Sequence, residues 1–211
     1  AKTVLIYHKN PYEVIPLQFV GVDPWINFMR WTHLPSAYTP LWIILTLPPY
    51  LLGFGIFLLI MWNIKLFVAG FYLATIWGIG EVLKKFDAKH ETLGMAIFAL
   101  NPLIIIESLV SAHNDIVMMA LAMVATYLLV SKQKLASWLV LSLSVATKLM
   151  TFFLLPVFLV RYKRNFDWRL LSLVLMIVGL LLVLTQREIL PWYWVWIMPF
   201  VALMPNRKDL T

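Results

Sequence analysis

The 211-residue sequence has no cysteine, few glycines and few charged residues, which make up 13% of the chain. The absence of cysteine excludes disulfides, thiolate catalysis and cysteine-ligated metal sites. A glycine-rich phosphate loop, a zinc motif and a nucleophile elbow are also missing. The chemistry of this protein therefore does not follow one of the common soluble-enzyme motifs.

Apolar residues dominate what is present: 62% of the chain is hydrophobic and the mean hydropathy is +0.86. A run of about 18 apolar residues is long enough for a membrane-spanning helix, and lipid leaves a backbone no hydrogen-bond partners outside its own helix. We therefore predict an all-α fold, a polytopic transmembrane helix bundle. The apolar runs are 41–62, 66–83, 93–112, 116–130, 135–160 and 170–185, with a shorter run at 192–204.

The net charge of +7 comes from short basic clusters that lie between the apolar runs. This pattern is typical of cytoplasmic loops in membrane proteins. Because no soluble basic domain remains, we predict no nucleic-acid partner. The clusters contain Lys84, Lys85, Lys89, Lys132, Lys134, Arg161, Lys163, Arg164, Arg169, Arg207 and Lys208.

The chain is predicted to form a single membrane domain over residues 1–211. Residues 1–37 are rich in proline and aromatic residues, which favour the membrane boundary, so we expect an outer interfacial loop with short helices there. Residues 38–205 would form the transmembrane helices. Pro48, Pro49, Gly53 and Gly55 predict an irregularity between residues 41 and 83.

The run 135–160 has basic residues at both ends and Lys148 near its middle. An ammonium group at the centre of a bilayer costs about 2.5 to 3.5 kcal/mol even on lenient scales. We therefore predict a broken helix around Lys148, made of two half-helices that place the amine at the outer face. With this break and the irregularity between residues 41 and 83 together, all basic loops fall on the other side of the membrane.

A second polar group interrupts the apolar pattern at His113, Asn114 and Asp115, with Glu107 shortly before it. Ionisable residues between membrane-spanning segments, at the depth of the bilayer, are candidates for a functional site. Capping of the helix that starts at Ile116 is an alternative for Asn and Asp. Glu107 needs a partner, which could be His113 or Lys148, and Lys148 itself should pair with a carboxylate or bind an anion.

A polar and aromatic turn follows the run that ends near residue 185. Arg187, Trp192 and Tyr193 could anchor the chain at the membrane interface. Alternatively, Arg187 could contact a phosphate while the aromatic side chains pack against an isoprenoid or a sugar ring.

Four motifs in order resemble polyprenyl-phosphate-sugar-dependent membrane glycosyltransferases of the GT-C class, in their mannosyltransferase-like branch. In this class an asparagine-proline and a glycine-histidine-asparagine-aspartate element precede a lysine-containing helix and a proline-tryptophan-tyrosine turn. Here Ala112 stands in place of the usual glycine. The corresponding residues are Asn10 to Trp42 for the outer loop and first helix, Asn101 to Asp115, Ala146 to Lys148 with Pro156, and Pro191 to Tyr193.

The resemblance implies transfer of a hexose, expected to be mannose, from a polyprenyl-phosphate donor to a glycan or lipid acceptor on the outer face of the cell membrane. The transfer is expected to invert the configuration at the anomeric carbon of the sugar. This chain is expected to be a fragment that lacks the first membrane helix and the catalytic base that follows it. We predict no resident cofactor: a divalent metal is compatible with the wider class, but no metal-ligand spacing supports one. Asp23 and Asp115 are the predicted catalytic residues and Lys148 and Arg187 the predicted ligands of the donor phosphate. The predicted substrate-binding residues are Tyr38, Glu107, His113, Asn114, Trp192 and Tyr193.

Two other functions are compatible with the same residues. A secondary transporter also uses broken helices and ionisable residues at mid-membrane depth. A non-catalytic scaffold would tolerate Lys148→Ala. The long aromatic segment 1–37 favours the transferase, because a transferase has to handle an acceptor and a transporter does not.

Overall fold

The computed structural model describes residues 1–160 and 167–205, and the regular elements in this part of the chain are all helices, with no strand. The all-α prediction is therefore confirmed. The elements before residue 100 are α1 (Lys2–Leu5), η1 (Pro16–Phe19), η2 (Pro24–Phe28), α2 (Pro40–Leu45), α3 (Leu47–Leu51), α4 (Phe57–Phe86), η3 (Ala88–His90) and α5 (Glu91–Ala99). Those that follow are α6 (Pro102–Ile105), η4 (Ile106–Val110), α7 (Asp115–Val130), α8 (Lys134–Thr147), η5 (Leu149–Leu154), α9 (Leu155–Val160), α10 (Trp168–Leu184), η6 (Pro191–Trp196) and α11 (Met198–Ala202).

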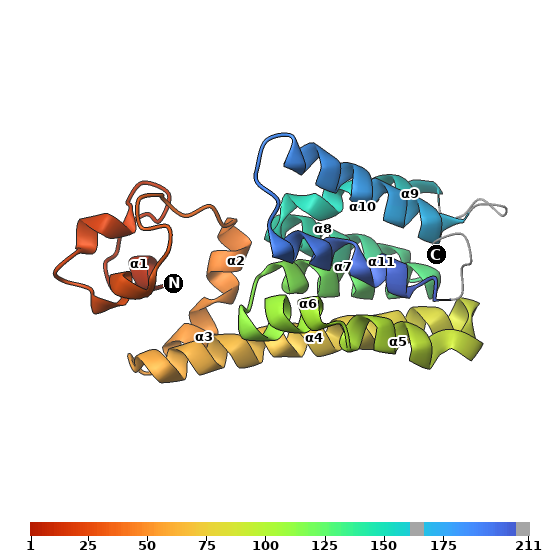
Figure 1. Cartoon of the computed structure of the whole chain (residues 1–211), viewed down its shortest axis with the longest axis horizontal. Helices are drawn as coiled ribbons and strands as arrows, with labels where there is room; N and C mark the ends of the chain where they lie inside the picture. Colours follow the sequence, from red (N-terminus) through yellow and green to blue (C-terminus); the bar gives the residue numbers. More distant parts are fainter. Residues whose placement is uncertain (161–166, 206–211) are drawn as a thin grey trace.

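Residues 1–37 form a separate lobe at one end of the molecule, and the long helix α4 runs along the rest of it (Figure 1). Helices α2 and α3 connect the two parts. Pro40 occupies the first turn of α2, where its missing N–H is harmless, and the Thr39 hydroxyl accepts the N–H of Trp42 as a helix cap. Asn63 on α4 donates to the Pro49 carbonyl on α3 over 3.3 Å, which fixes the corner between them.

The predicted irregularity between residues 41 and 83 lies at 52–56, after α3. Phe54 and Gly55 have positive φ angles of 49° and 77°, a backbone conformation that ends a helix. From Phe57 onward a single helix of 30 residues continues to Phe86. The apolar runs 41–62 and 66–83 therefore do not correspond to two separate helices. The helix break lies at residues 52–56, within the first run, and α4 continues through residues 63–65 between the two runs.

Helix α7 is the centre of the bundle, with 11 of its 16 residues buried. It packs against α4, α8 and η6. A Cβ atom at Gly78 on α4 would lie 3.0 Å from the Met123 Cβ, so this glycine allows α4 and α7 to approach closely.

Helices α8 and α9 form the two arms of a hairpin whose tip is Lys148. Helix α8 ends at Thr147, Lys148 has an extended backbone with φ −161° and ψ 131°, and η5 begins at Leu149. Because the chain reverses at this residue, the lysine lies at the end of two apolar helical segments rather than in the middle of one.

The segment before α7 is bent by 57° between residues 88–99 and 102–110. Pro102 lacks the N–H that would continue the preceding helix, and the Asn101 side chain accepts the N–H groups of Leu103 and Ile104 to start a new one. This second piece ends in the π-helical turn η4, which contains Glu107. A π-helical turn of this kind often marks a functional site.

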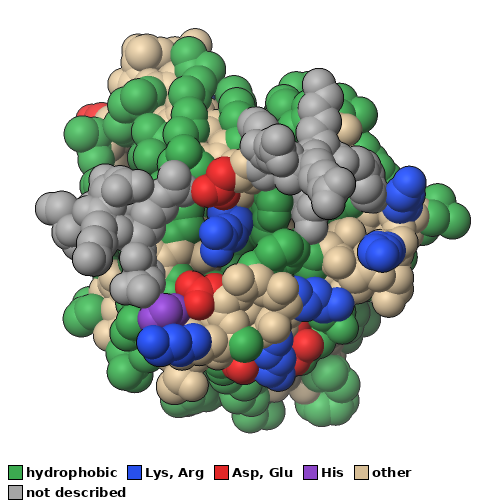
Figure 2. Space-filling view, turned by 90° about the vertical axis from the view of Figure 1, so that its right-hand side faces the viewer, with side chains coloured by type: hydrophobic (Ala, Val, Ile, Leu, Met, Phe, Trp, Pro, Cys, Tyr) green, Lys and Arg blue, Asp and Glu red, His purple; other side chains and the backbone are tan. Residues whose placement is uncertain are grey.

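The two ends of the bundle differ in charge. The end away from residues 1–37 carries clustered Lys and Arg side chains, and Figure 2 faces it. They come from the C-terminus of α4, from η3, and from the first residues of α8 and α10: Lys84, Lys85, Lys89, Lys134 and Arg169. The turns at residues 111–114, Lys148 and 185–190 lie at the opposite end.

Among the described residues, α4 is the one helix long and apolar enough to cross a membrane alone, and the bent pair 88–99 and 102–110 passes the same test if it is one span. Only 17% of the most apolar window of α4 is buried. The other apolar helices are shorter, from 10 to 17 residues.

Candidate functional site

The polar groups at the end opposite the basic side chains meet around Asp115, the first residue of α7. The Lys148 ammonium, at the tip of the hairpin, lies 2.7 Å from the Asp115 Oδ1 atom. The indole N–H of Trp196, from η6, donates to the same oxygen. The Lys148 Nζ atom also lies 5.2 Å from the centre of the Trp196 ring, which is a cation–π distance.

Burial makes this cluster electrostatically strong. Asp115 is 1% exposed and Trp196 is 2% exposed, whereas the Lys148 side chain retains 31% exposure. The Asp115 Oδ2 atom is buried and has no hydrogen-bond partner in the described part of the chain. A buried acceptor without a donor is costly, so this oxygen stands out as a position for a ligand hydroxyl.

The side chains of Asn114 and Asp115 do not cap helix α7. Asn114 occupies the N-cap position of α7, but its side chain makes no capping hydrogen bond. Asp115 uses its carboxylate for Lys148 and Trp196 instead.

Glu107 and His113 form a second polar pair beside the first. The His113 Nε2 atom lies 3.3 Å from the Glu107 Oε2 atom, and the His113 backbone N–H donates to the Glu107 carbonyl. The imidazole stacks on the Trp192 ring with centroids 4.2 Å apart. Glu107 is 7% exposed, so the π-helical turn brings a buried carboxylate to the histidine.

Tyr38 belongs to the same neighbourhood. Its backbone neighbour Thr39 donates from its hydroxyl to the Thr147 carbonyl over 2.9 Å, directly before Lys148. Tyr38 is 48% exposed and lies within electrostatic range of Asp115, as do Glu107 and His113. The structure therefore brings the residues that directly follow the predicted outer loop next to the predicted lysine and triplet.

Arg187 and Tyr193 lie at the edge of this group. Tyr193 is buried, its ring centroid is 4.5 Å from that of Trp196, and the charges of both Arg187 and Asp115 act on it. Arg187 is exposed and forms no ion pair with any residue in 1–160 or 167–205. Its guanidinium is thus available to a ligand.

Asp23 lies elsewhere, within the lobe formed by residues 1–37. Its Oδ1 atom pairs with the Lys2 ammonium at 2.6 Å and caps η2 by accepting the N–H of Trp25. Burial alone would raise the pKa of this carboxyl, but these hydrogen bonds hold it below its ordinary value, while burial and the nearby Asp23 raise the pKa of Tyr7 to about 12. None of these contacts joins Asp23 to the Asp115 cluster, and its catalytic role stays a prediction.

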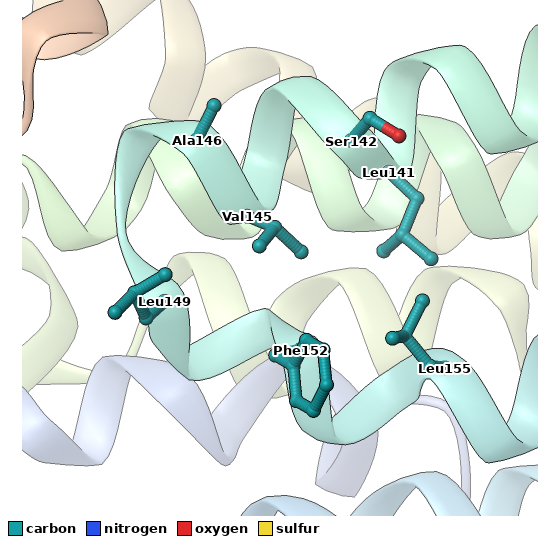
Figure 3. Close-up of a pocket in the computed structure, with 7 residues that line it drawn as sticks. All are labelled: Leu141, Ser142, Val145, Ala146, Leu149, Phe152 and Leu155. Carbon is teal, nitrogen blue, oxygen red and sulfur yellow. The ribbon is translucent and has the colours of Figure 1, made fainter.

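An apolar groove opens along the hairpin between α8 and η5–α9 (Figure 3). Its volume is about 300 Å³, and the side chains of Leu141, Val145, Phe152 and Leu155 face one another across it. Ala146 and Leu149 line the end of this groove. Ala146 lies two residues before Lys148 in the chain, and Leu149 directly follows it. The groove therefore ends at residues that are close to Lys148 in the chain, although Lys148 itself does not line it.

No group of three or more His, Asp or Glu side chains within residues 1–160 and 167–205 is placed to hold a metal ion.

Trp196 is the member of the site that sequence patterns did not single out. It lies in a run with two other tryptophans, Trp192 and Trp194, all of which resemble interface aromatics in sequence. Only burial separates them: Trp194 is 48% exposed, whereas Trp196 is enclosed. The partner of Asp23, Lys2, was also without a sequence signal, because the two are 21 residues apart.

A family model described as "Alpha-(1->6)-mannopyranosyltransferase, N-terminal domain" matches residues 3–164 of the chain. No curated protein and no solved structure matches it. The range matched by the family model contains Glu107, the 113–115 triplet and Lys148, and it ends before Arg187 and η6.

Proposed function

This chain belongs to the MptA/B family of alpha-(1->6)-mannopyranosyltransferases, GT-C membrane enzymes, and we propose that it transfers mannose from a polyprenyl-phosphate carrier at the outer membrane face. In this reaction an acceptor hydroxyl attacks the anomeric carbon and gives its proton to a carboxylate base, the bond from that carbon to the phosphate oxygen breaks, and polyprenyl phosphate leaves. An inverting transfer that gives an alpha linkage requires a beta-linked donor.

The observation that carries the proposal is a cation next to the end of an apolar groove. Lys148 holds its ammonium beside Asp115 at the hairpin tip, and its chain neighbours Ala146 and Leu149 line the groove between α8 and η5–α9. A lipid phosphate combines these two chemistries, since its anion needs a positive charge and its tail needs an apolar wall. Positive charge placed at the departing phosphate stabilises the transition state.

Arg187 and Asp115 complete the proposed roles. Arg187 is exposed on the turn before η6 and would contact the phosphate from the solvent side. The free Oδ2 atom of Asp115 would accept a hydroxyl of the sugar or acceptor. Glu107, His113, Trp192 and Tyr38 would line the sugar, with the stacked Trp192 and His113 rings as one wall.

The surface supports an embedded, polytopic bundle with this orientation. Large apolar side chains are exposed on α4, α8, α9 and α10. Examples are Leu66, Leu139, Leu159 and Leu181, at 57–69% exposure. Exposing so large an apolar area to water is unfavourable, whereas lipid covers it. Basic side chains gather at the end in Figure 2, which the positive-inside rule assigns to the cytoplasm. Lys148 and Asp115 at the other end would then face outward.

The test uses full-length protein in detergent, a labelled polyprenyl-phosphate-mannose donor, and product analysis for a new alpha-(1->6) linkage. Arg187→Ala is the first variant, because the arginine is exposed and forms no ion pair with the described residues. We expect it to raise the donor KM about 10-fold, the effect of losing one charge-assisted hydrogen bond of about 1.5 kcal/mol. Lys148→Ala should abolish most of the transfer.

Lys89→Ala serves as the matched control, since this lysine is also exposed but lies at the opposite end of the bundle. Its kinetics should equal those of the wild type. Transfer that is unchanged in both Arg187→Ala and Lys148→Ala would refute the proposed donor site.

A further inference from the structure

Trp196 contacts both charged groups of the site, although it lies outside the range that the family model matches. Resting on the proposed function, we propose that Trp196 is a positioning residue, which holds Asp115 and Lys148 so that the ammonium can bind the donor phosphate. The indole does not need to touch the donor. It acts through the carboxylate and the amine.

The hydrogen-bond geometry explains the effect. The Asp115 Oδ1 atom accepts from Lys148 and Trp196, and Oδ2 has no donor in the described residues. Indole nitrogen is a donor only, so this contact has a fixed direction. Without it, the buried carboxylate would depend on Lys148 alone, and its attraction would draw the ammonium away from an incoming phosphate.

The ring supplies a second constraint. The Lys148 Nζ atom lies 5.2 Å from the Trp196 ring centre, so the ammonium is held between the ring and the carboxylate. Trp196 is in turn fixed by the Tyr193 ring at 4.5 Å and is 2% exposed. Segment η6 therefore sets the position of the lysine, although the whole of α10 lies between them in the chain.

The variant Trp196→Phe keeps an aromatic ring and removes the N–H. Trp194→Phe is the matched control, because it makes the same change two residues away on an exposed side chain. The primary readout is the Kd for a polyprenyl phosphate without sugar, measured on full-length protein in detergent. This binding requires no turnover, so it is separate from the proposed transfer.

We expect Trp196→Phe to weaken polyprenyl phosphate binding about 10-fold and to raise the donor KM similarly, with a smaller change in kcat. Trp194→Phe should stay within twofold of the wild type. In a Lys148→Met background, Trp196→Phe should have no further effect on binding, whereas a loss of folding would weaken binding in either background.

Wild-type affinity in Trp196→Phe, or an equal loss in the Lys148→Met background, would overturn the positioning role. Absence of polyprenyl phosphate binding by the wild type would overturn it as well. If the wild type binds polyprenyl phosphate but transfers no mannose, the proposed function fails while the effect of Trp196→Phe on binding still decides the positioning role.

Discussion

The ion pair of Asp115 and Lys148 predicts an unequal response to removing either partner. Asp115 is 1% exposed, whereas the Lys148 side chain is 31% exposed. In Lys148→Met the carboxylate remains buried, with the Trp196 N–H as its remaining donor. In Asp115→Asn the freed ammonium can turn toward solvent, and the amide oxygen introduced by the substitution still accepts the indole N–H.

The magnitudes follow from this asymmetry. Leaving one charge of a buried pair uncompensated costs about 3 to 5 kcal/mol, so we expect this for Lys148→Met. Asp115→Asn loses a partly exposed ion pair and should cost about 1 kcal/mol. The double variant Lys148→Met with Asp115→Asn contains no buried charge at this site, so it should be more stable than Lys148→Met alone.

Thermal unfolding of the full-length variants in one detergent at pH 7 measures the order of their stabilities. With about 2 to 4 °C for each kcal/mol, Lys148→Met should melt roughly 6 to 20 °C below the wild type and Asp115→Asn about 2 to 4 °C below it. A melting temperature of Lys148→Met equal to or above that of Asp115→Asn would refute the reasoning. So would a double variant that is less stable than both single variants.

Two further predictions concern the backbone before α7 and the lobe of residues 1–37. Ala112 has a φ of 54°, in the left-handed region that favours glycine, so Ala112→Gly should stabilise the protein by about 1 kcal/mol; a lower melting temperature would contradict this. Because the folded pKa of Asp23 is lowered, its pairing with Lys2 stabilises the lobe above the ordinary carboxyl pKa of 3.8 and is lost as the pH falls through the folded pKa. Hydrogen exchange in residues 1–37 should therefore rise below pH 3.8 in the wild type, and an equal rise in Asp23→Asn would exclude this cause.

Much of the fold and part of the site follow from sequence through charge balance. Basic clusters and a central lysine require a reversal within 135–160, and the chain reverses at Lys148. The same argument requires Glu107 to have a partner, and His113 is that partner in the structure. Both results come from the cost of an unpaired charge in apolar surroundings, which depends little on how the helices pack.

Features that depend on packing could not be obtained this way. The bend of 57° before α6 follows from Pro102 and the Asn101 cap, which the pattern of apolar residues alone does not show, and the π-helical turn at Glu107 has no signal in that pattern either. Residues 93–112 therefore look like one helix in sequence. Trp196 was indistinguishable from its neighbours because its burial depends on the packing of η6 against α6 and α7, not on residues close to it in the chain.

The position of the ionisable groups follows from the order of chain reversals. The segments before α7, after α8 and before η6 all turn at the end opposite the basic loops, so each can bring polar residues to that end rather than to the middle of the bundle. A carboxylate from one turn then meets an ammonium from the next and an indole from the last. Each turn supplies a group that the other two need for charge or hydrogen-bond balance. A cation that is already compensated by Asp115, yet still partly exposed, can accept an anionic ligand without the cost of an isolated buried charge.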